Sequence, residues 1–156
     1  MTKRKNMEVN MASLSPLIEE VIGNGTAAEL TVAGNSMHPF LRHNVSRVRL
    51  SRADVLRNGD VVLYRRDNGA YVLHRIVKIK NGSYIMCGDN QYVLECGIRR
   101  DQILAVMTSF SRDGVRWKDA LSFGHKVYSA LWSRSRLVRR TFRGAKRRLA
   151  RLLQNF

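Results

Sequence analysis

The chain has 156 residues, 44% of them hydrophobic, and a formal net charge of +16. This length and apolar content suit one folded domain with a core and a short appendage, and they argue against a largely disordered chain. The extreme positive charge implies an anionic partner: nucleic acid, an anionic membrane surface or an acidic protein.

The two cysteines, Cys87 and Cys96, allow one disulfide, but nothing else resembles a disulfide-stapled secreted scaffold. They lack the paired Cys-x-x-Cys spacing of a zinc site, so we expect no metal and no cofactor. No apolar run approaches the roughly 20 residues needed to span a bilayer. The basic N-terminus is not followed by the long apolar segment of a secretory signal. These features predict a cytoplasmic protein with reduced cysteines.

The first apolar segment predicts a short amphipathic helix. Its apolar residues recur at helical spacing between Leu14 and Ile22. Ser15 followed by Pro16 resembles an N-cap with proline at the first helical position, and Gly23 lies where the helix should end. We assign residues 1–28 to a loose leader and this helix.

Short strands joined by tight turns are expected next. Val61–Tyr64 is uniformly apolar, as in a buried strand, and Tyr71–Lys80 is rich in β-branched and aromatic residues. Asn-Gly and Asp-Gly turns separate such runs. These patterns predict six or so antiparallel strands in a mainly β domain over residues 29–116. The other expected strands are Glu29–Ala33, Val48–Leu50, Ser83–Cys87 and Ile103–Phe110.

From residue 117 the pattern becomes helical and basic. Residues 120–156 contain ten Lys or Arg and no Asp or Glu. Apolar residues from Leu131 to Phe156 form a single stripe at helical spacing. We therefore predict a basic amphipathic helical tail over residues 117–156. The basic residues expected to contact a membrane or another anionic partner are Arg136, Arg139, Arg140, Arg143, Lys146, Arg147, Arg148 and Arg151.

Ser36 follows the first predicted strand, where a turn could hold its hydroxyl out from the backbone. A serine hydroxyl is a poor nucleophile until a neighbouring base takes its proton. His38 and His43 share its loop, where a turn residue is the simpler interpretation. His125 lies in or near the tail, and we expect it to be away from the β domain.

His74 lies inside the predicted strand Tyr71–Lys80, on the same face as apolar side chains. Taken alone, such a histidine is more often a core residue than a base. The next segment supplies Asp89 and Glu95, and a histidine base needs a carboxylate to fix its tautomer. The simpler interpretation of Asp89 is an Asx-turn residue. Lys78, about 13 Å farther along the strand, is a poorer fit as the base.

Four segments follow one another in chain order: Gly-Asn-Ser36-Met37-His-Pro39, Gly59-Asp60-Val61-Val62, His74-Arg75-Ile76-Val77 and Gly88-Asp89-Asn90. Together they resemble the signal peptidase I and SOS-repressor superfamily of serine peptidases. The resemblance covers about Leu30 to Phe110, and more narrowly the chain looks like the small bacterial S24/S26-type peptidases. Its histidine, where many members have lysine, is similar to that of the archaeal and endoplasmic-reticulum signal peptidases.

The resemblance implies a coiled β fold, a partly open antiparallel barrel, that carries a serine endopeptidase site. Ser36 would be the nucleophile and His74 the general base, with either Asp89 or Glu95 orienting the histidine. The substrate would be a precursor or leader peptide, bound as an extended strand. Gly34 stands where some signal peptidases carry a second serine. The residues expected at the oxyanion or substrate subsite are Asn35, Met37 and Pro39.

The alternative function is a non-enzymatic module that keeps the peptidase-like fold and docks to an anionic partner through its basic tail. In either case an anionic membrane is the favoured partner, because no recognised nucleic-acid-binding module accompanies the charge. A cationic helix with one apolar stripe suits the headgroup region of an anionic leaflet. We therefore expect a peripheral location on the inner face of the cell membrane.

Overall fold

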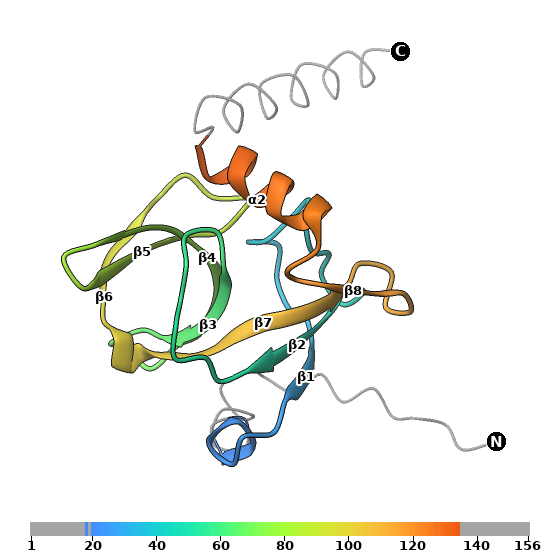
Figure 1. Ribbon diagram of the computed structural model, residues 1–156, viewed down its shortest axis with the longest axis horizontal. Helices are drawn as coiled ribbons and strands as arrows, with labels where there is room; N and C mark the ends of the chain where they lie inside the picture. The colour runs from blue at the N-terminus through green and yellow to red at the C-terminus, as the bar shows by residue number, and fades with distance from the viewer. Residues whose placement is uncertain (1–17, 19, 135–156) are drawn as a thin grey trace.

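The computed structural model describes residue 18 and residues 20–134, and its fold is mainly β (Figure 1). Eight strands form one antiparallel sheet in the order β1-β2-β7-β3-β4-β5-β6, with β8 paired to β7. Within the described chain, β1 and β6 do not pair with each other, so the sheet is not closed. The elements are β1 (Ala28–Thr31), β2 (Arg47–Ser51), β3 (Val61–Arg65), β4 (Tyr71–Lys80), β5 (Ser83–Cys87), β6 (Glu95–Ile98), the 3₁₀ turn η1 (Arg100–Gln102), β7 (Ile103–Ser111), β8 (Trp117–Asp119) and α2 (Phe123–Arg134).

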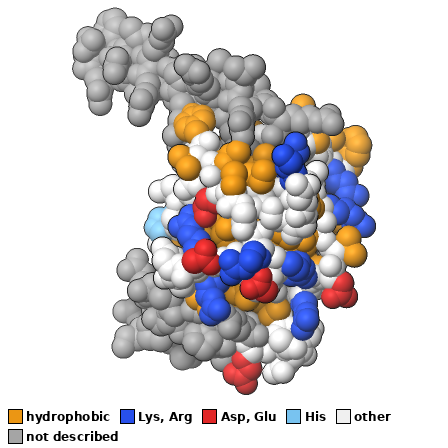
Figure 2. Space-filling model, turned by 90° about the vertical axis from the view of Figure 1, so that its left-hand side faces the viewer, with side chains coloured by type: hydrophobic (Ala, Val, Ile, Leu, Met, Phe, Trp, Pro, Cys, Tyr) orange, Lys and Arg blue, Asp and Glu red, His pale blue; other side chains and the backbone are white. Residues whose placement is uncertain are grey.

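The antiparallel, mainly β architecture confirms the sequence-based prediction at that level. Strand β4 spans the predicted run, and the turn at Asn81 and Gly82, both with positive φ, leads directly into β5. On the face shown in Figure 2, Lys and Arg side chains alternate with Asp and Glu over much of the described surface. Both cysteines lie in the described part of the chain, and no disulfide joins them.

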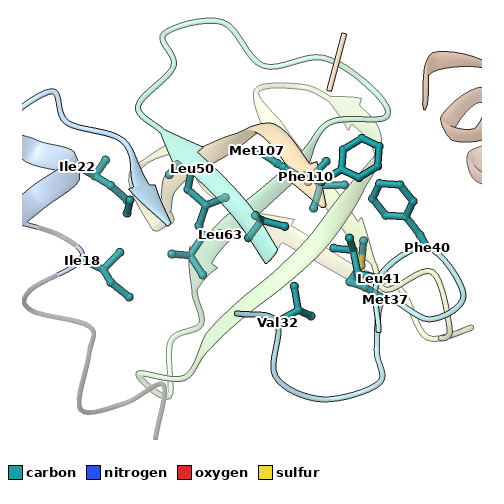
Figure 3. Packing of buried hydrophobic residues seen from close by; sticks show 14 residues of the cluster. Ile18, Ile22, Val32, Met37, Phe40, Leu41, Leu50, Leu63, Met107 and Phe110 are labelled. Atoms are coloured by element: carbon teal, nitrogen blue, oxygen red, sulfur yellow. The ribbon is translucent and has the colours of Figure 1, made fainter. Parts of the chain in front are cut away.

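Two apolar clusters lie on opposite faces of the sheet. Strand β3 contributes to both, because alternate residues of a strand point to opposite sides. Val61 and Leu63 belong to the larger cluster, together with Met37 from the loop after β1 (Figure 3). Val62 and Tyr64 belong to the second cluster. Burial on both faces explains why this strand is apolar at every position from 61 to 64.

Three features differ from the sequence-based prediction. Glu95–Ile98 forms the edge strand β6, which its short, glycine-containing sequence did not indicate. Trp117–Asp119 forms strand β8, where the helical tail was expected to begin. Pairing with β7 and the Arg49 guanidinium, 4.0 Å from the Trp117 ring centroid, stabilise that strand. Helix α2 therefore starts only at Phe123.

Helix α2 packs against the sheet through His125, which corrects the expectation that this histidine lies away from the β domain. The ring of His125 is buried and stacks on Phe40, with ring centroids 5.0 Å apart. Its Nδ1 donates to the carbonyl of Ala120 at 2.6 Å. Stacking and burial among aromatic rings, which the sequence pattern did not reveal, hold the first turn of α2 on the core.

The predicted N-terminal helix and basic tail fall mostly on residues outside the described ranges. Of the former, residues 18 and 20–23 are helical. The eight basic residues from Arg136 to Arg151 that were expected to contact an anionic partner all lie beyond residue 134. Among the described residues, no helix is both long enough and apolar enough to cross a membrane.

Gly59 marks the point where α2 touches the turn before β3. It has a positive φ of 96°, and a Cβ there would lie 2.5 Å from Ser129 Oγ. We expect Gly59→Ala to lower the free energy of unfolding by about 1–3 kcal/mol beyond the cost of the backbone conformation, because Ser129 must move. Urea unfolding measures the change.

Gly69→Ala is the matched control, since Gly69 has a similar φ of 83° and open space where the added methyl group would lie. It should cost only the conformational term of about 1–2 kcal/mol. Equal losses for the two variants would show that the packing of α2 on this turn contributes little to stability.

Candidate active site

The Ser36 loop connects β1 to β2, and its backbone is anchored on both sides of the serine. Met37 is only 2% exposed and lies in the larger core cluster, beside Phe40 and Leu41. The Leu41 N–H donates to the Met37 carbonyl at 2.9 Å. Ser36 itself is partly exposed. Burial of the following residues therefore presents the serine at the surface of a well-packed turn.

Ser36 and His74 line one cavity of about 240 Å³, although 38 positions separate them in the sequence. The cavity lies between the end of β1 and the first half of β4. Its wall combines these two polar side chains with Arg66 and with apolar residues. The apolar residues include Leu30, Val32, Met37, Leu63, Val72 and Leu73.

Gly88 gives a measure of how closely the serine loop approaches the histidine. A Cβ on Gly88 would lie 2.6 Å from the Ser36 carbonyl oxygen and 3.0 Å from His74 Nε2. Both atoms therefore lie close to the same point, which a glycine leaves open and a larger residue would fill. Within the described residues, Ser36 Oγ makes no hydrogen bond to His74, so the two side chains share the cavity without a direct contact.

The other nitrogen of His74 faces an acid. Nδ1 lies 3.2 Å from Glu95 Oε1, and the Tyr64 hydroxyl lies 3.2 Å from the same nitrogen. Arg66 pairs with Glu95 through Nε at 2.7 Å and Nη2 at 2.5 Å. Because an ionised carboxylate only accepts hydrogen bonds, Nδ1 carries the proton and Nε2 keeps its lone pair. That is the tautomer required of a general base acting through Nε2.

Burial keeps the ring of His74 neutral. Burial lowers the pKa of His74 to about 4, and the nearby Arg66 charge adds to this, while the Glu95 carboxylate opposes it. Burial alone would raise the pKa of Glu95, but hydrogen bonds from Arg66 and Tyr64 outweigh it and hold that pKa below its usual value. At neutral pH the site thus contains a neutral imidazole beside an ionised carboxylate.

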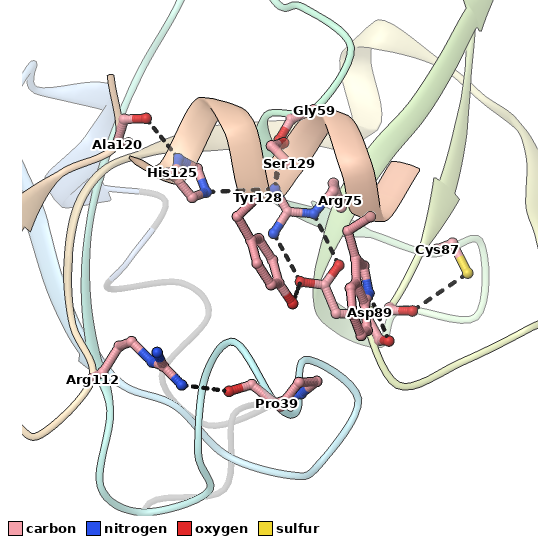
Figure 4. A network of polar contacts seen from close by, with 12 residues as sticks. Pro39, Gly59, Arg75, Cys87, Asp89, Arg112, Ala120, His125, Tyr128 and Ser129 are labelled. Carbon is pink, nitrogen blue, oxygen red and sulfur yellow. Dashed lines mark hydrogen bonds and ion pairs between the residues drawn. The ribbon is translucent and has the colours of Figure 1, made fainter. Parts of the chain in front are cut away.

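Asp89, the second acid considered as a partner for His74, instead pairs with Arg75. Arg75 donates from Nε to Oδ1 at 2.9 Å and from Nη2 to Oδ2 at 2.8 Å, and both side chains are fully buried (Figure 4). Strand alternation places His74 and Arg75 on opposite faces of β4. The two neighbouring residues therefore reach two different acids.

Helix α2 covers the Arg75–Asp89 pair. Ser129 Oγ accepts from Arg75 Nη1 at 2.8 Å, and the Tyr128 hydroxyl donates to Asp89 Oδ2 at 3.3 Å. The indole of Trp132 donates to the Asp89 carbonyl at 2.9 Å. Figure 4 shows Ser129 and Tyr128 of α2 beside the pair. The helix therefore supplies polar partners to charges that are buried behind the serine loop.

The segment that follows Gly88 also binds the serine loop directly. The Asn90 N–H donates to the Ser36 carbonyl at 2.7 Å, and the Asn90 side-chain amide donates to the Asn35 carbonyl at 2.9 Å. Two consecutive carbonyls of the loop are thus held by Asn90. In the described chain the N–H groups of Ser36 and Met37 donate to no protein acceptor, which leaves the Ser36 N–H available to an oxyanion.

The remaining sequence candidates have structural partners. The Pro39 carbonyl accepts from Arg112 Nη2 at 3.0 Å, and Pro39 does not line the cavity. His43 Nδ1 accepts from the Gly34 N–H at 2.9 Å, as expected of a turn residue. Lys78 is exposed on β4 beyond the irregularity in register after Ile76, and it does not line the cavity.

Tyr64 and Arg66 were not identified from the sequence. Strand pairing could have indicated them. Val62 pairs with His74 across the β3–β4 hairpin, and alternation places Val62, Tyr64 and residue 66 on the same face. A tyrosine and an arginine two residues apart, at the end of an otherwise apolar strand opposite a histidine, indicate a polar site. Their relation to Glu95 could not be foreseen without β6.

A scan against protein-family models and a search of curated proteins found no match to this chain. Within the described ranges, no group of three or more His, Cys, Asp or Glu side chains is placed to hold a metal ion. The chemical interpretation of the site therefore rests on the geometry of Ser36, His74 and Glu95.

Replacing Gly88 by alanine should disturb this geometry. The added methyl would overlap the Ser36 carbonyl and press on His74 Nε2, so the loop must move outward. We expect a loss of about 1–3 kcal/mol in the free energy of unfolding, typical of overpacking. Denaturant unfolding measures it, with Gly23→Ala as the control, since a Cβ at Gly23 meets nothing within 4 Å. An unchanged Gly88→Ala protein would mean that the loop is not held as described.

Proposed function

We propose that the protein is a serine endopeptidase in which Ser36 is the nucleophile, His74 the general base and Glu95 the acid that orients the histidine. One observation carries the proposal: Ser36 and His74 line the same cavity, and Glu95 lies 3.2 Å from His74 Nδ1. Serine, imidazole and carboxylate in this order form the arrangement by which a hydroxyl is activated.

In the proposed reaction, Ser36 Oγ attacks the carbonyl carbon of a peptide bond and its proton passes to His74 Nε2. The Nδ1–H stays with Glu95, which stabilises the imidazolium that forms. The N–H of Ser36, and that of Asn35 beside it, donate to the negatively charged carbonyl oxygen. Protonated His74 then gives its proton to the leaving amine, and water hydrolyses the acyl-enzyme through the same base.

Ser36 Oγ must turn toward the ring before this step. In unliganded enzymes the hydrogen bond between nucleophile and base is often long and closes only in the substrate complex. A rotation about the Ser36 side-chain bond requires no movement of the anchored backbone. Tyr64 and Arg66 act through Glu95 in this scheme: they hold the carboxylate ionised and fixed in front of Nδ1.

The cavity suits a substrate that binds as an extended peptide between two strand edges. Strand β1 pairs only with β2 in the described chain, and β4 pairs with β5 only from Arg75 onward. The backbones of Leu30–Val32 and Val72–Leu73 therefore face each other across the cavity without an intervening described strand. Main-chain pairing with both edges would give affinity, and the small apolar cavity would select a small apolar side chain.

The order of the four motifs, and the meeting of the Ser36 and His74 motifs at one cavity, support a signal peptidase I or SOS-repressor type of coiled β fold. The open antiparallel sheet is compatible with that fold. On this basis we propose a precursor or leader peptide as the substrate class. The histidine base and its carboxylate partner support the Ser-His variant of the superfamily.

The test is hydrolysis of a peptide library, followed by mass spectrometry of the products. Ser36→Ala and His74→Ala should each lower kcat/KM by about 10⁴-fold or more, and Glu95→Gln should also lower it strongly. Ser83→Ala and Lys78→Ala are the matched controls, because neither side chain lines the cavity. Cleavage that survives Ser36→Ala would refute the assignment. A wild-type protein without peptidase activity would favour a binding module.

The pKa of His74 makes a second prediction for active wild-type protein. A base acts in its neutral form. The pKa of His74 is about 4, so the ring is neutral at any pH well above that value. The acidic limb of the kcat/KM profile should therefore fall near pH 4, well below the value of about 6.5 for an ordinary histidine. In the Arg66→Gln variant this acidic limb should move to higher pH, because a positive charge that lowers the pKa of His74 is removed. An acidic limb near 6.5 in the wild type would exclude the buried His74 as the base.

A further inference from the structure

Helix α2 has its apolar side turned away from the protein. Its inner side packs on the sheet through polar and aromatic residues: His125, Tyr128, Ser129 and Trp132. Its outer side carries Phe123, Val127 and Leu131, which are 84%, 41% and 65% exposed. A surface helix of a globular protein normally buries its apolar stripe. The reversed arrangement indicates that the outer side contacts something apolar.

The three exposed residues are spaced four apart, so they form one continuous stripe along the helix. We call this the outer stripe of α2. Leu121, 61% exposed, lies just before the helix. In Figure 2, hydrophobic side chains gather at the top of the molecule, the end at which α2 lies in Figure 1. Exposed apolar patches of this kind mark interaction sites.

The surroundings of the stripe are cationic. Lys126 is exposed beside Val127. From residue 120 to the C-terminus the sequence has ten Lys or Arg and no acid, and eight of the ten follow directly after α2, in residues 135–156. The occupant of the stripe must therefore be apolar and carry negative charge next to its apolar part.

An anionic phospholipid bilayer has both properties within a few ångströms of each other. Its acyl chains accept apolar side chains, and its phosphates attract Lys and Arg. Nucleic acid offers negative charge but no apolar region that could bury a phenyl and two aliphatic side chains. A second copy of the chain would bring a charge of +16 against +16. We propose that the outer stripe of α2 lies in the headgroup region of an anionic bilayer.

The inner contacts of α2 determine how the rest of the protein is held there. Ser129 Oγ donates to the Gly59 carbonyl at 2.7 Å, and Trp132 to the Asp89 carbonyl at 2.9 Å. These bonds fix the helix to the sheet on the side opposite the stripe. Insertion of the stripe therefore leaves the docked side of α2 in place and attaches the β domain to the bilayer as one body. This proposal goes beyond the peptidase function and does not depend on it.

Co-sedimentation of the full chain with vesicles tests the proposal. The vesicles contain phosphatidylcholine alone or an equal mixture of phosphatidylcholine and phosphatidylglycerol. The wild type should bind the anionic vesicles, less strongly in high salt, and pure phosphatidylcholine far less. Phe123→Gln combined with Val127→Gln should weaken binding at least about tenfold, the effect of losing about 1.4 kcal/mol of apolar burial.

Val55→Gln is the matched control, because Val55 is 70% exposed but lies outside α2. It should bind like the wild type. Circular dichroism checks that each protein is folded, and the single variant Phe123→Gln replaces the double variant if the latter is not. Equal binding by the stripe variant and the wild type would overturn the proposal, as would equal binding to both vesicle types. A wild-type dimer that ignores vesicles and dissociates in the stripe variant would assign the stripe to a second copy instead.

Discussion

A fully buried ion pair, Arg75 with Asp89, holds together the parts of the molecule that meet at the candidate site. Removing both charges from water is costly, and the pair is stable only because its remaining hydrogen-bonding groups are satisfied. The carbonyl of Gly59 and the side chains of Ser129 and Tyr128 provide those partners. The pair thus ties β4, the turn before β3, the segment after β5 and helix α2 to one another.

The position of this pair in the sequence gives it influence over the site. Arg75 directly follows His74, so fixing the guanidinium fixes the backbone that carries the imidazole. Asp89 lies between Gly88, which leaves room for the serine loop, and Asn90, which binds the Ser36 carbonyl. The ion pair therefore supports the backbone beside both Ser36 and His74. Glu95, on the other face of β4, is left to interact with His74.

Much of the fold could be predicted from sequence, because its signals are local. The turn at Asn81–Gly82 and the uniformly apolar Val61–Tyr64 depend on neighbouring residues alone. The pairing of a serine with a particular histidine rested on four motifs in order, and the structure lines both around one cavity. Which acid faces His74 could not be predicted, because the answer depends on β6, a short edge strand at Glu95 whose pairing is determined by tertiary contacts.

Helix α2 was hard to predict for a different reason. A prediction from periodicity assumes that a helix buries its apolar residues, whereas α2 is attached by hydrogen bonds and stacked rings.

The attachment of α2 also affects how the chain folds during its synthesis. Ser129 reaches back 70 positions to Gly59, and Trp132 reaches back 43 to Asp89. While a nascent chain is still emerging from the ribosome, the buried charges lack their cover, and Arg75 and Asp89 acquire their last partners only after residues 128–132 have been synthesised.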